Sequence, residues 1–173
     1  MITHDSALLA KEAAAVYGGL AFDLGTGELE VPRLALKTIP SMLWIGVDIR
    51  PAARPRSFPS VLSVRAGVET VPRLFPAALA DLVTANPPYL VEGAGRPSPD
   101  PDREARRRGG PLLLYRFAFA AAHLLKPGGL ALFSFRKGME DRVRTAFRAS
   151  GVEPEKVRFS GAAGVLAGRR TAP

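Results

Sequence analysis

The chain contains no cysteine and only two histidines, His4 and His123, among its 173 residues. Without cysteine there are no disulfides, thiolate nucleophiles or cysteine-ligated zinc sites. Two histidines this far apart in sequence do not make a histidine-rich metal site, so we expect no bound metal. Most classes of metalloenzyme and cysteine-dependent enzyme are therefore excluded.

The sequence also lacks a long apolar run. None reaches the roughly 18 residues that a membrane-spanning helix needs. Residues Met1–Lys11 have neither the basic start nor the apolar segment of a signal peptide. We therefore expect a cytoplasmic protein with no membrane partner. With 47% hydrophobic residues and only 33 glycines and prolines in total, the chain should fold, and we expect one domain over residues 1–173.

The net charge of +8 is unevenly distributed. Residues 1–90 carry 8 basic and 8 acidic side chains, whereas residues 91–173 carry 16 and 8. A solvated basic surface would account for this excess, and so would a polyanionic partner. Charge alone leaves both interpretations open.

Apolar segments alternate with glycine- and proline-rich segments along the whole chain. An N-terminal helix is expected within residues 1–18, beginning at Asp5 or Ser6 and ending near Tyr17. Further helices are expected at residues 28–37, 112–125 and 139–150, and strands at residues 20–22, 43–49, 61–65, 82–85, 130–135, 157–160 and 164–167. Residues 91–110 are expected to form a surface loop. This order predicts an α/β fold with a Rossmann-like, doubly wound, mostly parallel sheet.

A glycine turn follows the first expected strand, in the sequence Asp23-Leu24-Gly25-Thr26-Gly27. Glycines allow a ligand to approach the backbone closely, and the N-terminus of the following helix offers free N–H groups. A simple structural connector would have the same composition. The turn is therefore a candidate ligand site that needs a second observation.

Asp48 and Ile49 end the second expected strand and supply that observation. A carboxylate at this position accepts hydrogen bonds from ribose hydroxyls in nucleotide-binding βαβ units. A solvated turn is the alternative role for Asp48. Together with the glycine turn, Asp48 favours a cofactor that contains adenosine.

The strongest signal is Asn86-Pro87-Pro88-Tyr89, directly after the fourth expected strand. The adjacent prolines fix the backbone, so the Asn86 side chain and the Pro87 carbonyl can present two acceptors in a rigid geometry. Two converging acceptors suit the two hydrogens of an –NH2 group, and its nitrogen lone pair then points in one direction. Tyr89 can cover the planar group that carries the nitrogen.

These three motifs resemble those of class I S-adenosylmethionine-dependent methyltransferases that modify amino nitrogens. The resemblance implies that residues 23–27 form the cofactor loop, that Asp48 and Ile49 lie at the ribose, and that the tetrapeptide is catalytic. Two positions depart from the family pattern. Leu29 replaces a further glycine, which we expect to narrow the space beside the cofactor. Glu69, in place of an aspartate, is our candidate for the adenine contact.

The segment after the tetrapeptide resembles the tRNA N6-adenine methyltransferases, through Gly93-x-Gly95-Arg96, Ser98-Pro-Asp-Pro-Asp102-Arg103 and Ala105-Arg106. The resemblance implies an RNA substrate, most plausibly tRNA, methylated at N6 of adenine. Five arginines of this loop are candidates for phosphate contacts, with plain solvation as the alternative. They are Arg96, Arg103, Arg106, Arg107 and Arg108.

Two other functions remain open. Methyltransferases that act on N5 of glutamine in release factors share the tetrapeptide and a stretch similar to Gly109–Arg116. The glutamic acid and proline segment that precedes this stretch in those enzymes is missing here. A non-catalytic nucleic-acid-binding protein of the same fold is the other alternative, and the departures at Leu29 and Glu69 are its evidence.

Overall fold

The computed structural model describes residues 3–16, 18–50, 59–88 and 112–172. Several sequence predictions fall outside these ranges. They are the catalytic role of Tyr89, the surface loop at residues 91–110, and the phosphate contacts of its five arginines.

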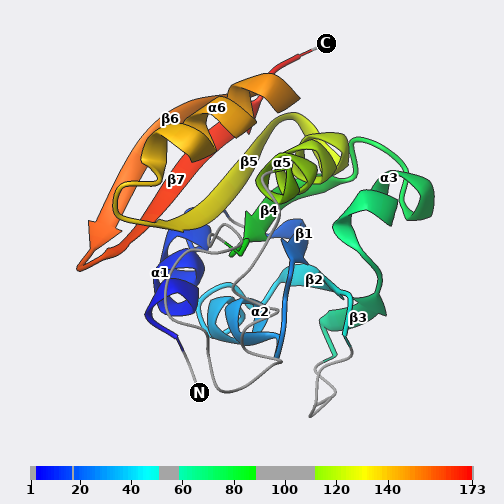
Figure 1. Ribbon diagram of the computed structural model, residues 1–173. Coiled ribbons are helices and arrows are strands. Elements are labelled where there is room, and N and C mark those ends of the chain that lie inside the picture. The colour runs from blue at the N-terminus through cyan, green and yellow to red at the C-terminus, as the bar shows by residue number, and fades with distance from the viewer. Residues whose placement is uncertain (1–2, 17, 51–58, 89–111, 173) are drawn as a thin grey trace.

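Seven strands form one sheet in the order β3-β2-β1-β4-β5-β7-β6 (Figure 1). Neighbouring strands are parallel except for β7, which runs antiparallel to both β5 and β6. The strands are β1 Gly19–Leu24, β2 Met42–Asp48, β3 Val61–Arg65, β4 Ala80–Ala85, β5 Leu125–Arg136, β6 Val152–Ser160 and β7 Ala163–Arg170. The predicted mostly parallel α/β sheet is confirmed.

Helices cover both faces of this sheet (Figure 1). Their bounds are α1 His4–Ala13, α2 Glu30–Ala35, the 3₁₀ helix η1 Val68–Thr70, α3 Val71–Leu74, α5 Leu113–Leu124 and α6 Glu140–Ser150. Side chains of a strand alternate between the two faces, so each strand contributes to two cores. In β5, Phe133 packs in the core beneath α5 and α6, and Leu132 packs in the core beneath α1 and α2.

The first helix differs from its prediction at both ends. It begins one or two residues earlier, at His4, because Thr3 is the N-cap and its Oγ1 accepts a hydrogen bond from the Ser6 backbone N–H at 3.1 Å. It ends at Ala13 instead of Tyr17. There the Ala14 N–H bonds to the Lys11 carbonyl, three residues back, which tightens and closes the last turn.

Two strands, β5 and β6, start five residues earlier than the sequence indicates. β5 begins at Leu125, although Pro127, Gly128 and Gly129 predict a turn before residue 130. These residues lie at an irregularity in the pairing of β5 with β4. β6 begins at Val152 despite Pro154, because β6 is an edge strand with one paired neighbour and the missing N–H costs little there.

Candidate functional site

The carboxyl ends of β1, β2 and β4 meet at one edge of the sheet. In the register, Leu24 of β1 pairs with Val47 of β2 on one side and with Ala85 of β4 on the other. The residues that follow these positions are therefore neighbours in space. This edge brings together three of the features singled out in the sequence: the glycine turn, Asp48 and Asn86.

The glycine turn folds over the end of β2. The backbone N–H groups of Gly25 and Thr26 both donate to the Val47 carbonyl, at 2.8 and 3.2 Å. Gly25 has a φ of +70°, and a Cβ there would lie 3.2 Å from the Phe117 ring. Both the backbone angle and the ring therefore require glycine at this position.

Asp48 ties the turn to β2. Its Oδ2 accepts a hydrogen bond from the Gly27 N–H at 2.9 Å, and its Oδ1 accepts one from the Arg50 N–H at 3.0 Å. A carboxylate offers about four acceptor positions, so both oxygens keep capacity for ribose hydroxyls. The neighbouring Ile49 side chain is 63% exposed and offers an apolar surface beside the carboxylate.

Leu29 occupies a backbone conformation that glycine favours. Its φ is 59° and its ψ is 32°, and it is the N-cap of α2. The side chain is nevertheless buried, and it lies against Gly46 of β2, where a Cβ would be 2.5 Å from the Leu29 Cδ2. Leu29 therefore packs beneath the turn against the sheet, which differs from the narrowing of the cofactor space that we expected.

Asp23 is a buried carboxyl at the end of β1. Its Oδ1 accepts a hydrogen bond of 2.6 Å from the Thr84 hydroxyl of β4. Burial raises the pKa of Asp23 to about 6, although the Thr84 and Thr26 hydroxyls act in the opposite direction. Only 3% of Asp23 is exposed, so its main structural role is to join β1 to β4.

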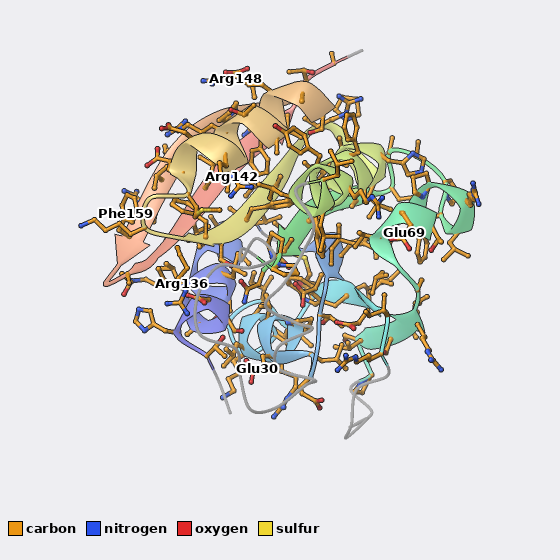
Figure 2. The ribbon with its side chains drawn as sticks, viewed as in Figure 1. Glu30, Glu69, Arg136, Arg142, Arg148 and Phe159 are labelled. Atoms are coloured by element: carbon orange, nitrogen blue, oxygen red, sulfur yellow. The ribbon has the colours of Figure 1, made fainter. Side chains whose placement is uncertain are left out.

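Glu69 extends the row of site residues to β3. It lies in η1, directly after this strand, and its exposed carboxylate folds back against Gly67. Figure 2 shows Glu69 on the side of the molecule opposite Phe159 of β6. The candidate ribose and adenine residues thus come from the adjacent strands β2 and β3.

The Asn86 amide is held by a residue that the sequence analysis missed. The Ser134 hydroxyl of β5 donates a 2.7 Å hydrogen bond to the Asn86 Oδ1. Ser134 is fully buried, Pro87 is buried and Pro88 is half-buried. No local sequence signal points to Ser134, because the contact depends on the register between β4 and β5.

The described residues contain no arrangement typical of a metal site or of a membrane-spanning helix. No group of three or more histidine, aspartate or glutamate side chains in that part of the chain is placed to hold a metal ion. No helix among those residues is long and apolar enough to cross a membrane.

Solved structures of several methyltransferases share this fold. An O-methyltransferase family protein from Burkholderia thailandensis matches with a TM-score of 0.66 and 16% identity, over 96% of this chain and 55% of that one. The ribosomal protein L11 methylase from Lactobacillus delbrueckii subsp. bulgaricus matches with a TM-score of 0.69 and 14% identity, over 99% and 81%. A mutant 16S rRNA (adenine(1408)-N(1))-methyltransferase from Catenulisporales acidiphilia, solved with its cosubstrate SAM, matches with a TM-score of 0.60 and 18% identity, over 99% and 94%.

The chain thus spans about half the length of the Burkholderia protein and most of the other two. No protein-family model and no curated protein sequence matches it. Identities of this size establish the fold alone. The chain has the Rossmann-like fold found in S-adenosylmethionine-dependent methyltransferases.

Proposed function

We propose that this chain is an S-adenosylmethionine-dependent methyltransferase that acts on an exocyclic amino nitrogen, and that this nitrogen is N6 of adenine in a tRNA. One observation carries the proposal: the glycine turn, Asp48 and Asn86 lie at one edge of a sheet that has the methyltransferase fold. In this proposal the cofactor binds at the first two features and the amine binds beside it at Asn86.

The residues at β1, β2 and β3 suit S-adenosylmethionine. Gly27 has a φ of +54°, and a Cβ there would meet nothing within 4 Å, so the space above the turn is open. In this proposal the Asp48 carboxylate accepts from the ribose hydroxyls, the exposed Ile49 side chain covers the adenine, and the Glu69 carboxylate accepts from the adenine amino group. When bound, the cofactor supplies an electrophilic methyl group on a positively charged sulfur.

Asn86 and Pro87 orient the amine in this proposal. The Asn86 Oδ1 uses one lone pair for the Ser134 hydroxyl and keeps a second for one hydrogen of the –NH2 group. The Pro87 carbonyl takes the other hydrogen. This arrangement directs the nitrogen lone pair along one line, and positioning of that kind contributes several kcal/mol to transfer. Pro88 keeps the turn rigid, and Tyr89 stacks on the base.

The positive net charge of the chain, +8, supports a polyanionic substrate. In this proposal Arg96, Arg103, Arg106, Arg107 and Arg108 contact phosphates of the RNA.

A glutamine side-chain amide has the same –NH2 geometry, so protein-glutamine methylation is the competing interpretation of the tetrapeptide. The neighbours include both an rRNA methyltransferase and a ribosomal-protein methylase.

Methyl-labelled cofactor, supplied with total RNA, DNA and protein fractions, tests the proposal directly. We expect label in RNA, recovered after digestion as N6-methyladenosine. The Asn86→Ala variant should transfer methyl at least about 100-fold more slowly, with cofactor affinity and folding nearly unchanged, because only the amine position is affected. Label in the protein fraction would favour glutamine methylation. Absence of cofactor binding at millimolar concentration would favour the non-catalytic alternative.

A further inference from the structure

The positive charge of the protein lies mainly in the half formed by α5, β5, α6, β6 and β7. Residues 112–172 carry 11 basic and 4 acidic side chains, whereas the described residues before position 89 carry 6 and 8. Residues 89–111 include five arginines but also four carboxylates. Residues 89–111 are therefore close to neutral as a whole, and the basic excess belongs to the described C-terminal half.

Part of this charge lies at the same sheet edge as Asn86. Ser134 pairs with Val165 of β7, and Val165 pairs with Arg158 of β6, so these three residues are level and share one face of the sheet. Arg136 is two residues beyond Ser134 and shares that face too. At about 4.8 Å between strands, the Arg158 backbone lies about 10 Å from that of Ser134. A stacked nucleic-acid strand covers this distance with about three nucleotides, at about 3.4 Å each.

The hairpin between β6 and β7 is anchored at this edge. The Lys137 N–H donates to the Ala162 carbonyl at 2.9 Å. The His4 Nε2 atom of α1 lies 2.8 Å from the Ser160 Oγ. Phe159 packs edge-on against Phe135, with ring centroids 5.7 Å apart, and remains 53% exposed. The hairpin is therefore held in one position, so its side chains lose less conformational entropy when a ligand binds.

We propose that Arg136, Lys137, Arg158 and Phe159, which we call the hairpin edge, form a surface that binds single-stranded or looped RNA beside the amine site. The three cations contact phosphates, and the exposed Phe159 ring stacks on a base. Figure 2 shows Phe159 at the tip of the β6–β7 hairpin. Arg148 lies away from that tip, in the last turn of α6. This inference rests on the proposed function, since it names where that substrate lies.

Nearby acidic groups leave the surface positive. The Asp5 carboxylate lies 3.5 Å from the Arg136 guanidinium, and Asp5 is buried, so this carboxylate is not accessible to a ligand. Glu140 is paired with Arg144 on α6, while Asp141 is exposed in the first turn of that helix. An acidic protein segment would satisfy the cations as well, but it would make no use of the exposed Phe159 ring, which lies on the opposite side of β6 from Arg158. The combination of exposed cations and an exposed aromatic ring at this end of the sheet favours RNA.

The test measures binding of a fluorescein-labelled 12-nucleotide oligoadenylate RNA by anisotropy at several salt concentrations, without cofactor. The main variant is Lys137→Gln/Arg158→Gln, which leaves the ion pair between Arg136 and Asp5 intact. The matched control is Arg73→Gln/Arg148→Gln, because it removes the same charge from exposed positions on α3 and at the far end of α6. We expect the main variant alone to lower the log–log salt slope by about 1.4 and to weaken binding about tenfold at moderate salt.

Phe159→Leu separates stacking from charge. It keeps apolar packing against Phe135, and we expect about tenfold weaker RNA binding with an unchanged salt slope. An equal loss in both charge variants, or equally strong binding of a polyglutamate peptide, would overturn the hairpin edge as an RNA site. Methyl transfer to RNA is measured separately. RNA that is methylated normally by the main variant would refute this inference and leave the proposed function intact.

Discussion

The Ser134 hydroxyl donates a 2.7 Å hydrogen bond to the Asn86 Oδ1, across the boundary between β5 and the segment that follows β4. The two residues are 48 positions apart in sequence, and Ser134 is fully buried. The bond fixes the rotation of the Asn86 amide, and one lone pair of its oxygen remains for another donor. Ser134 is therefore a positioning residue in the proposed reaction, since it acts through Asn86.

Ser134→Ala should slow single-turnover methyl transfer about fivefold, because the loss of one hydrogen bond, worth about 1 kcal/mol, lets the Asn86 amide rotate. Cofactor affinity should stay the same. Ser150→Ala is the matched control, since it removes a buried hydroxyl whose partner is the Phe147 carbonyl of α6. Equal rate losses in the two variants would mean that Ser134 contributes only to stability.

Asp48→Ala should weaken cofactor binding by about 1–3 kcal/mol, measured by calorimetry. The variant lacks the carboxylate that accepts hydrogen bonds from the ribose hydroxyls in the proposed complex and from the Gly27 and Arg50 N–H groups. Urea unfolding should show a reduced free energy of unfolding for the same reason. Asp141→Ala, an exposed position on α6, serves as the charge control. A variant that is less stable but binds the cofactor normally would limit Asp48 to holding the turn.

Asp23 should make stability depend on pH between about 4 and 6. Its pKa is about 6 in the folded protein and about 4 in the unfolded chain, so the unfolded state releases its proton first as the pH rises. The stability present below pH 4 is then lost on the way to pH 6, by about 3 kcal/mol. Asp23→Asn removes the ionisation and retains an oxygen that accepts from Thr84.

Urea unfolding of the native protein and Asp23→Asn, from pH 4 to pH 7, measures this contribution. The variant should gain stability relative to the native protein as the pH rises, and the difference should level off above about pH 6. A difference that stays constant over this range would show that the pKa of Asp23 is the same in the folded and unfolded states, so that burial does not raise it.

The sequence contains enough local information to predict the strand tips of the site. Val61–Arg65 is predicted at its observed bounds, and Gly151 ends α6 with a φ of +79°, as a helix-terminating glycine should. The positions of Asp48 and Asn86 are also predictable from local sequence, because each polar residue directly follows a short apolar run that forms a strand. Parallel strands then place such residues at one edge.

The remaining features depend on pairing between distant segments. The contact of Ser134 with Asn86 requires the register in which Ala85 pairs with Phe133, and no short-range pattern encodes it. The side-chain direction of Leu29 depends on the small size of Gly46 in a neighbouring strand. The basic excess of residues 91–173 is evident from the sequence, but the position of Arg158 level with Ser134 depends on the pairing of β5, β7 and β6.

Leu29 and Gly46 should be energetically coupled, because a Cβ at Gly46 would lie 2.5 Å from the Leu29 Cδ2 and 2.8 Å from the Thr26 Cγ2. Gly46→Ala alone should cost about 1–3 kcal/mol through overpacking. Leu29→Gly alone should lose about 2–5 kcal/mol of buried packing, offset by about 1 kcal/mol because glycine relieves the left-handed backbone.

In the double variant the added methyl group enters space that Leu29 vacates, so the combined loss in unfolding free energy should be smaller than the sum by about 1 kcal/mol. Gly46→Ala combined with Leu166→Ala, buried in β7, is the control and should be additive within about 0.5 kcal/mol. Cofactor affinity of Leu29→Gly should stay within about threefold, since the side chain lies beneath the turn. Strict additivity of the Leu29 and Gly46 changes, together with tighter cofactor binding by Leu29→Gly, would instead place the side chain in the cofactor space.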